Sequence, residues 1–257
     1  MSKRILVTND DGVRSEGILA LAHALKPLGE VTIVAPLNEA SAIGHALTLR
    51  RPLQVEKFGE RIFSVDGTPT DCVNIAITKV LGGMPDLIVS GINKGWNIGD
   101  DVTYSGTVGG ALEGALLGVP SLAVSLQFTR ETFDFGPASA AASRYARAVL
   151  ERGLPPRTLL NINVPTGPVR GYRVTVQGKR NHVTSVMDVI DPRQRVWYWI
   201  EEGQNNWEPH DRSDYQAVKD GFVSVTPLHP DLTHYDAIKA VESLPVETDA
   251  DSGISRP

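Results

Sequence analysis

Residues 5–12 read Ile5-Leu6-Val7-Thr8-Asn9-Asp10-Asp11-Gly12, a short apolar run that ends in polar residues and a glycine. An apolar run without alternation is typical of a strand that is buried on both faces of a parallel sheet. The Asn-Asp-Asp-Gly that follows is typical of a loop at the end of such a strand. The stretch therefore predicts a strand whose exit loop carries two adjacent carboxylates.

Strand-like and helix-like segments alternate on both sides of this loop through the first half of the chain. Apolar spacing and turn residues predict, in order, a helix over 17–28, a strand over 31–35, a hairpin of 53–58 with 61–65, a helix over 70–80 with Thr70 as N-cap, a strand over 86–90, a glycine-rich loop over 91–104, a helix over 105–117 and a strand over 121–126. This alternation predicts an α/β fold with a parallel sheet that helices cover on both faces.

The pattern changes after residue 159, where β-like segments follow one another without regular helices between them: 159–164, 172–177, 195–200 and 222–227. We expect a catalytic core over 1–165, a β-rich extension and oligomerisation arm over 166–245 with a returning strand and helix, and a flexible tail over 246–257. In the arm, Trp197 and Trp199 share one strand face and Val196 and Tyr198 the other. Such a strand needs cover on both faces, either from a partner subunit or from its own domain.

Composition limits the classes of function. The chain has 257 residues and a formal net charge of −5, which argues against general binding of nucleic-acid polymers but allows one small anionic ligand in a local pocket. A single cysteine, Cys72, expected on a buried helix face, suits a reducing compartment. The longest uncharged stretch, 114–129, is broken by Gly118 and Pro120, so no membrane span is expected. We predict a cytoplasmic protein, since the apolar run near the N-terminus is too short for a signal peptide.

Polar side chains follow several of the predicted strands, and exit loops of parallel strands meet at one edge of a sheet. These residues are Asn9, Asp10, Asp11, Ser41, Gly44, His45, Asn93, Asn97, Asp100 and Asp101. Adjacent carboxylates repel one another unless a cation neutralises them, and an all-oxygen set favours magnesium, manganese or calcium over zinc. The alternative is that Asp10 and Asp11 only form a turn and a helix N-cap.

Ser105-Gly106-Thr107 begins a predicted helix, where backbone N–H groups and the helix dipole can hold an anion. A simple N-cap with close helix packing is compatible with the same residues. The sequences G-x-G-x-x-G, G-x-x-x-x-G-K-[ST] and G-x-S-x-G do not occur, which disfavours dinucleotide-binding, P-loop and serine-hydrolase chemistry. Gly44 and His45 lie in a candidate site loop, where His45 can contact substrate or orient a ligand.

Several motifs together resemble the stationary-phase survival protein SurE family of metal-dependent nucleotidases. They are Thr8-Asn9-Asp10-Asp11-Gly12, Ser41 with Gly44-His45, Gly67-Thr68-Pro69-Thr70-Asp71-Cys72, Ser90-Gly91-Ile92-Asn93, Tyr104-Ser105-Gly106-Thr107-Val108, Asn161-Ile162-Asn163-Val164-Pro165, Asp191-Pro192-Arg193, Tyr198-Trp199 and the 221–228 segment. The resemblance implies a Rossmann-like core with a C-terminal β extension used in homodimer or homotetramer assembly. It also implies hydrolysis of nucleoside 5′- and 3′-monophosphates, and of short-chain polyphosphate by some members.

The resemblance further implies one divalent ion per subunit, Mn²⁺ or Mg²⁺, held by residues matching Asp10, Asp11, Ser41 and Asn93. Phosphate contacts then fall on Asn97, Ser105, Gly106 and Thr107, and we add Asn9 from the first strand exit. The working hypothesis gives Asp10, Asp11 and Asn97 catalytic roles, with a metal-activated water attacking the phosphoryl group.

Two residues depart from the family pattern. Ala40 stands where an arginine commonly precedes the serine ligand, and Trp96 stands where a proline is usual. Ala40 cannot give phosphate any contact that the arginine gives in the family, and Trp96 can change the shape of the wall that faces the nucleoside. Two alternatives to an enzyme stay open: a metal-dependent nucleotide-binding sensor without turnover, and a structural scaffold whose loop carboxylates are only turns.

Overall fold

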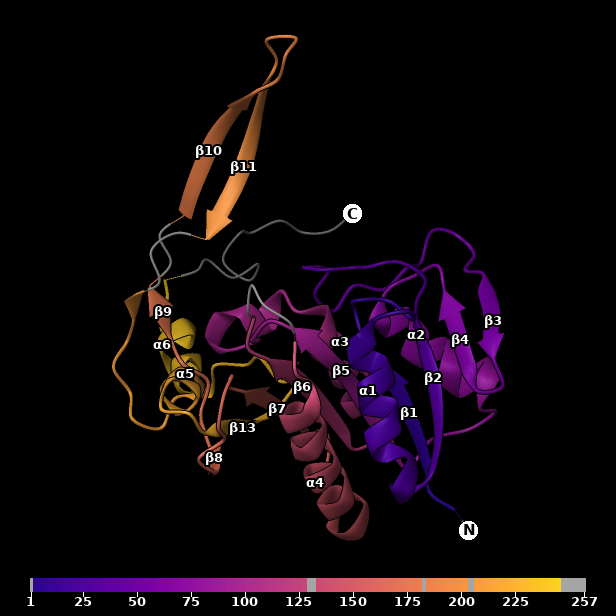
Figure 1. Ribbon diagram of the computed structural model, residues 1–257. Helices are drawn as coiled ribbons and strands as arrows, with labels where there is room; N and C mark the ends of the chain where they lie inside the picture. Colours follow the sequence, from indigo (N-terminus) through magenta and orange to yellow (C-terminus); the bar gives the residue numbers. More distant parts are fainter. Residues whose placement is uncertain (1, 129–132, 182–183, 203–205, 246–257) are drawn as a thin grey trace, which may run out of the picture.

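The computed structural model describes residues 2–128, 133–181, 184–202 and 206–245, and its centre is a nine-stranded sheet (Figure 1). The strands of this sheet lie in the order β3-β4-β2-β1-β5-β6-β7-β13-β8. Its strands are β1 Arg4–Thr8, β2 Glu30–Pro36, β3 Val55–Gly59, β4 Ile62–Val65, β5 Leu87–Lys94, β6 Ser121–Leu126, β7 Leu159–Val164, β8 Tyr172–Val174 and β13 Val223–Leu228.

The helices are α1 Glu16–Leu25, η1 Lys26–Leu28, α2 Pro69–Ile75, η2 Ala76–Val80, η3 Gly99–Thr103, α3 Gly106–Leu116, α4 Gly136–Arg152, α5 Asp214–Lys219, η4 Tyr235–Ala237 and α6 Ile238–Glu242. Two small antiparallel pairs stand outside the main sheet: β9 Arg180–Asn181 with β12 Asn206–Trp207, and β10 Thr184–Ile190 with β11 Val196–Glu202.

The middle of the sheet is parallel, as the strand pattern predicts. Strands β4, β2, β1, β5, β6 and β7 all run in the same direction, and β3 and β13 pair antiparallel at the two sides. Ile5 of β1 is in register with Val31 of β2 and with Leu87 of β5. β1 is therefore an interior strand, which explains why its sequence is apolar without alternation.

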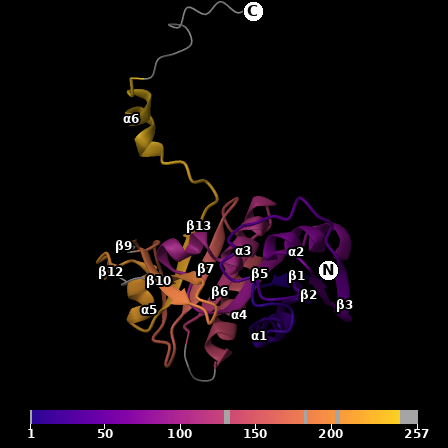
Figure 2. The same ribbon diagram turned by 90° about the horizontal axis from the view of Figure 1, so that it is seen from above.

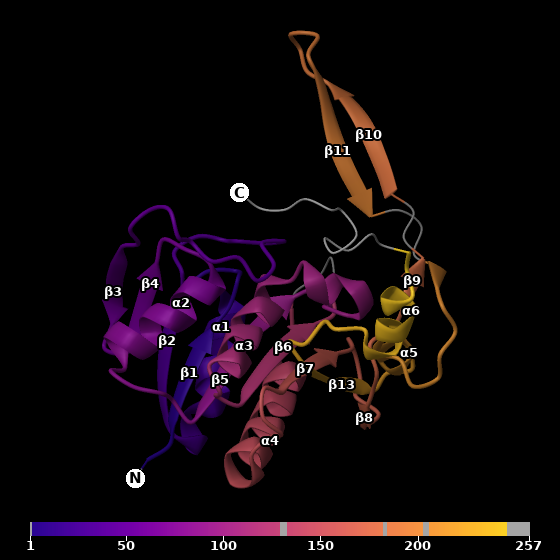
Figure 3. The same cartoon turned by 180° about the vertical axis from the view of Figure 1, so that it is seen from behind.

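Helices cover both faces of this sheet (Figures 1 and 3). Ile5 and Val7 of β1 belong to the apolar cluster that includes α1 and α4. Leu6, on the opposite face of the same strand, belongs to the cluster of α2, and Cys72 is fully buried there. The buried helix face predicted for Cys72 is thus confirmed, as is the α/β fold with helices on both faces.

Several predicted boundaries were wrong. α2 is capped by Thr68, not Thr70: the Thr68 hydroxyl accepts from the Asp71 N–H, and the Asp71 carboxylate accepts from the Thr68 N–H. This capping box places Pro69 at the first helical position, which suits a residue without an N–H. β5 extends to Lys94, four residues beyond the expected end, because pairing with β6 continues to Lys94 opposite Leu126. The long helix α4 was not among the expected elements.

The predicted extension contributes to the main sheet and also projects from it. β13 pairs with β7 and β8 pairs with β13, so the returning strand is part of the core. The expectation of no helix between the late strands was wrong, since α5 precedes β13. The predicted helix over 17–28 ends as the 3₁₀ turn η1, and the strand over 172–177 ends at Val174. The predicted tail over 246–257 lies outside the described residues.

The β10–β11 hairpin stands away from the sheet and its helices (Figure 1). Trp197, Tyr198 and Trp199 are 55%, 69% and 65% exposed. Of the two possible covers for this strand, the described residues of the hairpin's own domain do not supply one. Figure 2 shows that α6 also lies away from the body of the molecule. Within the described ranges, none of the helices has the combined length and apolarity that crossing a membrane requires.

Candidate active site

The predicted site residues gather where the connections from β1 diverge. β2, the next strand in sequence, pairs with one side of β1, whereas β5 pairs with the other side. Such a switch in strand order opens a crevice at the carboxyl ends of the strands, and ligands of α/β proteins bind there. Asp10 and Asp11 follow β1 at this point, and Asn93 lies near the carboxyl end of β5.

Asn9 organises the loop after β1. Its Nδ2 donates to the Gly12 carbonyl at 3.1 Å and to the Ser15 Oγ at 2.8 Å. Ser15 is the N-cap of α1, so these bonds hold the loop against the start of that helix. As far as the structure describes the chain, Asn9 Oδ1 is buried without a hydrogen-bond partner. The Asn9 side chain, which was predicted to contact phosphate, thus uses its Nδ2 donor within the loop, and its Oδ1 acceptor has no partner among the described residues.

Asp10 lies between β1 and the N-terminus of α3. It is 5% exposed, and its Oδ1 accepts a hydrogen bond from the Thr107 hydroxyl. Burial raises the pKa of Asp10, while bonds from the Thr107 side chain and backbone oppose that rise. A Cβ on Gly106 would lie 2.9 Å from the Asp10 Cβ, so a glycine is needed where α3 meets this carboxylate.

Asp11, the second carboxylate of the loop, is half-buried. Burial, and then the charges of Asp10 and Glu39, raise the pKa of Asp11 to about 6, although the Lys94 charge lowers it. Among the described residues, no hydrogen-bond donor reaches the buried Asp11 Oδ2. A buried carboxylate oxygen without a donor, beside a second carboxylate, is the environment that a bound cation would stabilise.

Ser41 and Asn93 supply neutral oxygen atoms near the carboxylates. The loop after β2 is tied to the site because the Ala40 N–H donates to the Asp10 carbonyl at 2.8 Å. Ser41 is exposed, and its hydroxyl donates to Glu39 Oε1 at 2.7 Å. Asn93 is half-buried, and its Nδ2 donates to the Gly95 carbonyl at 3.0 Å, so its carbonyl oxygen is the atom that can bind a cation.

Glu39 is a carboxylate that the sequence analysis did not select. Its charge raises the pKa of both Asp10 and Asp11, so it adds to the negative potential of the crevice. Its position in the exit loop of β2 is the signal that could have identified it. The part of the chain that the structure describes holds no cluster of three or more Asp, Glu, His or Cys with metal-binding geometry, so any cation here also needs hydroxyl or amide ligands.

The loop over 95–105 brings the candidate phosphate-binding groups to the carboxylates. Ser105 is the N-cap of α3, and its Oγ accepts from the Val108 N–H at 3.1 Å. Gly106 and Thr107 form the buried first turn of this helix. The first-turn N–H groups and the positive end of the helix dipole thus lie beside Asp10, and the Thr107 N–H is one of the groups that stabilise its charge.

Asn97 is held from three directions by buried polar groups. Its N–H donates to Asn163 Oδ1 at 2.8 Å, and its carbonyl accepts from Asn161 Nδ2 at 2.7 Å. Its own Nδ2 donates to Ser125 Oγ at 2.8 Å. These bonds give a role to the Asn161-Ile162-Asn163 motif of β7, whose two asparagines share a strand face. Trp96 is anchored similarly, with its Nε1 donating to the Val164 carbonyl at 2.9 Å.

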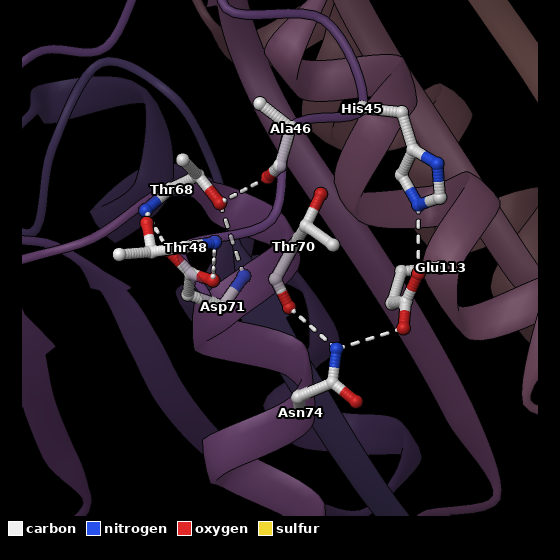
Figure 4. A network of polar contacts seen from close by, with 8 residues as sticks. All are labelled: His45, Ala46, Thr48, Thr68, Thr70, Asp71, Asn74 and Glu113. Carbon is white, nitrogen blue, oxygen red and sulfur yellow. Dashed lines mark hydrogen bonds and ion pairs between the residues drawn. The ribbon is translucent and has the colours of Figure 1, made fainter. Parts of the chain in front are cut away.

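Gly44 connects the β2 exit loop to the segment before α3, and His45 connects it to α3 itself, as Figure 4 shows for His45. Gly44 has φ +60°, a conformation that favours glycine, and its N–H donates to the Tyr104 carbonyl at 2.8 Å. His45 Nε2 lies 2.7 Å from Glu113 Oε2, and Asn74 Nδ2 donates to Glu113 Oε1 at 2.7 Å. The bond from His45 lowers the pKa of Glu113. One ring nitrogen of His45 is therefore engaged by Glu113.

The same loop is also fixed to the start of α2, as Figure 4 shows. The Thr48 N–H donates to Asp71 Oδ1 at 2.9 Å, and the Thr68 hydroxyl donates to the Ala46 carbonyl at 2.7 Å. These contacts explain why the Gly67–Cys72 motif accompanies the site residues in sequence. The motif positions the loop that carries Ser41.

Comparison with known proteins places this arrangement among related chains. The family described as Survival protein SurE matches residues 5–184. The 5′-nucleotidase SurE of Geobacter metallireducens is 51% identical over 243 residues, which cover 93% of this chain and 96% of that protein. The 5′-nucleotidase SurE of Geotalea daltonii is 52% identical over 242 residues, covering 93% and 98%.

A solved structure agrees in fold as well as in sequence. The crystal structure of the SurE protein from Aquifex aeolicus superposes with a TM-score of 0.83 at 44% identity, covering 93% of this chain and 98% of the other. These matches confirm the resemblance that the sequence motifs indicated.

Proposed function

This chain belongs to the SurE family, and from that premise we propose that it is a metal-dependent nucleotidase that hydrolyses nucleoside 5′-monophosphates to nucleoside and phosphate. The relatives named as 5′-nucleotidases are about half identical to it over nearly their whole length. One structural observation supports the proposal independently of the sequence identity to these relatives. The buried carboxylate of Asp10 meets the N-terminus of α3 at the switch point of the sheet, and the half-buried Asp11 follows it in the chain.

We assign one divalent cation per subunit, Mn²⁺ or Mg²⁺, to Asp10, Asp11, Ser41 and Asn93. Within the described residues, Asp11 Oδ2 has no hydrogen-bond partner, and the pKa of Asp11 is raised. Both features fit a carboxylate that a bound cation would stabilise. The donors are all oxygen, which suits hard divalent ions. Bound there, such an ion would supply Lewis-acid polarisation of a phosphoryl oxygen and activation of a water molecule.

The chain's own groups then bind and orient the phosphate. The N-terminus of α3, from Ser105 to Thr107, directs backbone N–H groups toward the place where a phosphate would approach Asp10. Asn97, held rigidly by β7, borders the same loops, whereas Asn9 has its Nδ2 bonded to Gly12 and Ser15 and therefore supports the loop instead of the phosphate. Preorganised donors of this kind stabilise the charge that spreads over the equatorial oxygens during phosphoryl transfer.

We extend the proposal to nucleoside 3′-monophosphates and short-chain polyphosphate, because the proposed groups contact the metal and the phosphate rather than the sugar. His45 is proposed as a contact for the remainder of the substrate, next to Gly44. Its engagement with Glu113 suits a role in orienting the loop or the substrate.

We also propose that the chain acts as a homodimer or homotetramer. The β10–β11 hairpin exposes apolar side chains on both faces, among them Trp199 and Ile200 at 65% and 79% exposure. The segment around α6 exposes Leu232, Tyr235 and Val241. Exposed apolar surfaces of this extent are typical of protein–protein contacts.

The deciding experiment is a phosphate-release assay of the purified chain with nucleoside 5′- and 3′-monophosphates and tripolyphosphate, each with Mn²⁺, Mg²⁺ and EDTA. We expect release from 5′-monophosphates that EDTA abolishes. Stoichiometric nucleotide binding without release would replace the enzyme with a sensor. A melting midpoint that Mn²⁺ leaves unchanged would contradict the metal site, because a ligand of the native state must stabilise it.

A further inference from the structure

The short helix η3 directly precedes the phosphate-binding turn, and residues from the distant extension hold it. Both backbone groups of Gly99, the first residue of η3, are engaged by that extension. Its N–H donates to Asp214 Oδ2 at 2.9 Å, and its carbonyl accepts from Gln177 Nε2 at 2.9 Å. Asp214 lies 115 positions away in sequence, so this bond is made only in the folded protein.

Asp214 joins three segments. Its side chain is fully buried, and its Oδ1 also accepts from the Gly178 N–H at 2.9 Å and from the Tyr215 N–H at 2.7 Å. A carboxylate that only stabilised the first turn of α5 would need donors from that turn alone. Its bonds to Gly99 and Gly178 instead connect η3, the strand region before β9 and α5.

Two further contacts hold η3 at the same place. Arg180 forms an ion pair with Asp101 at 2.6 Å, and the Arg180 side chain is only 7% exposed. Trp207, stacked on Tyr215 with ring centroids 4.4 Å apart, packs against Gly99. A Cβ on Gly99 would lie 2.6 Å from the Trp207 ring, and Gly99 has φ +53°. We call Gln177, Arg180, Trp207 and Asp214 the η3 clamp.

The segment from Gly99 to Ser105 is short and hydrogen-bonded, so a displacement of Gly99 would also displace Ser105. The Tyr104 N–H donates to the Asp101 carbonyl at 3.1 Å, and the Tyr104 carbonyl accepts from the Gly44 N–H at 2.8 Å. Ser105 follows at once as the N-cap of α3. The segment between the clamp and the phosphate-binding turn is therefore bonded at both ends, and a shift of Gly99 would move that turn.

We propose that the η3 clamp, and Asp214 in particular, consists of positioning residues that set the Ser105–Thr107 turn for phosphate binding. The proposal rests on the proposed function, since it concerns the phosphate of that substrate. Clamp residues act through η3 on the backbone donors of the turn, whose effect on phosphate depends steeply on distance. The turn also contacts Asp10 through the Thr107 hydroxyl, whereas no contact of this kind links it to Asp11, Ser41 or Asn93 within the described residues, so the clamp should affect phosphate more than the cation.

The test compares Gln177→Ala with the matched control Gln216→Ala. Both are glutamines of the extension, Gln177 exposed and Gln216 half-buried, but Gln216 donates to Asp220 Oδ1 at 2.8 Å instead of to η3. Asp214→Asn is the second variant. It keeps the size of the side chain but replaces one carboxylate oxygen by an NH₂ group, which cannot accept a hydrogen bond from a backbone N–H. Its control is Asp220→Asn, which removes an ion pair with Arg173.

Three quantities are measured for each folded variant: KM and kcat for a nucleoside 5′-monophosphate, inhibition by inorganic phosphate, and the Mn²⁺ concentration for half-maximal activity. For Gln177→Ala and Asp214→Asn we expect KM and the phosphate inhibition constant to rise together by about tenfold. The kcat should fall as well, since the same donors stabilise charge in the transition state. The Mn²⁺ requirement should change less than the phosphate inhibition constant, because Asp10 is the proposed ligand that the turn contacts, and both controls should behave as wild type.

A folded Gln177→Ala variant with unchanged KM and phosphate inhibition overturns the inference, even if Asp214→Asn fails to fold. An equal loss in the Gln216→Ala control also overturns it, since the effect would then be general destabilisation. If the wild-type chain releases no phosphate, the proposed function fails by itself. Binding of inorganic phosphate with Mn²⁺, measured by calorimetry in wild type and Gln177→Ala, then decides the role of the clamp.

Discussion

Strands β1 and β11 are both built from consecutive large apolar residues, yet their surroundings are opposite. Leu6 and Val7 of β1 are fully buried, because α1 and α4 cover one face of the sheet and α2 and α3 the other. Tyr198 and Ile200 of β11 are 69% and 79% exposed on a hairpin that projects from the molecule. The same apolar character is buried inside the chain in one case and left exposed within the described residues in the other, where we propose that a second subunit covers it.

The two regions also differ in what they lack. The end of β1 carries the buried Asp10 and the half-buried Asp11, and burial together with the charges of Asp10 and Glu39 raises the pKa of Asp11 to about 6. The β10–β11 hairpin instead exposes apolar surface that water solvates poorly. A cation is our proposed answer to the first feature and a partner surface our proposed answer to the second. The comparison therefore separates a proposed region of chemistry from a proposed region of assembly.

The largest expected effect lies at the end of β1. Asp10→Asn should lower phosphate release at least about 100-fold, because a group that acts in the transition state is lost. The melting midpoint without metal should stay the same or rise, since burial of the charged carboxylate is costly and the amide removes that charge. Activity and thermal unfolding are measured side by side.

Asp86→Asn is the matched control, because Asp86 precedes β5 at the opposite edge of the sheet and pairs with Lys3 at the surface. It should leave activity unchanged. Full activity of Asp10→Asn at saturating metal would refute the assignment of Asp10.

The next effect is steric and concerns Gly106. In Gly106→Ala the new Cβ would lie 2.9 Å from the Asp10 Cβ, so the helix start and the carboxylate must separate. We expect a loss of stability of about 1–3 kcal/mol and a clear loss of activity. Gly59→Ala is the control, since its Cβ would meet Ile62 at an ordinary 3.5 Å. Denaturant unfolding of both variants checks the difference; equal stability of the two would disprove the close contact.

The hairpin should behave in the opposite way. Ile200→Lys places a charge on a side chain that is 79% exposed in the single chain, so the chain's own stability should change by no more than about 0.5 kcal/mol. The assembled state should dissociate, because the lysine would be buried against a partner. Sedimentation velocity reports the size of the assembly. An unchanged assembly would show that another surface holds the subunits together.

The smallest effect concerns the pair of His45 and Glu113. Because His45 holds the pKa of Glu113 below its ordinary value of 4.5, this pair contributes stability above that value and loses it as the pH falls through the lowered pKa. At pH 6, His45→Ala should be less stable by no more than about 1 kcal/mol. The wild-type and variant melting midpoints should converge below pH 4. A difference that grows toward acid pH would have the wrong sign for this mechanism.

The strand exits were predictable because parallel strands bring their loops to one edge whatever the details of packing. Asp10, Asp11 and Asn93 lie at that edge as the sequence indicated. Glu113 and Asp214 were missed because nothing local marks them as neighbours of the site, whereas Glu39 lies in the exit loop of β2 and could have been identified from that position. Asn97 was expected as a phosphate ligand, but its support by Asn161 and Asn163 appears only in the fold.

By itself, the sequence determined the alternation of strands and helices, the pair of carboxylates after β1 and the two-sided apolar strand, since each depends on residues close together in the chain. The tertiary structure decided which groups meet. Thr107 reaches Asp10 across 97 positions, and Asp214 reaches Gly99 across 115. Hydrogen bonds form only over a narrow range of distances and angles, and strand register and helix packing set those distances; no local pattern of residues encodes them.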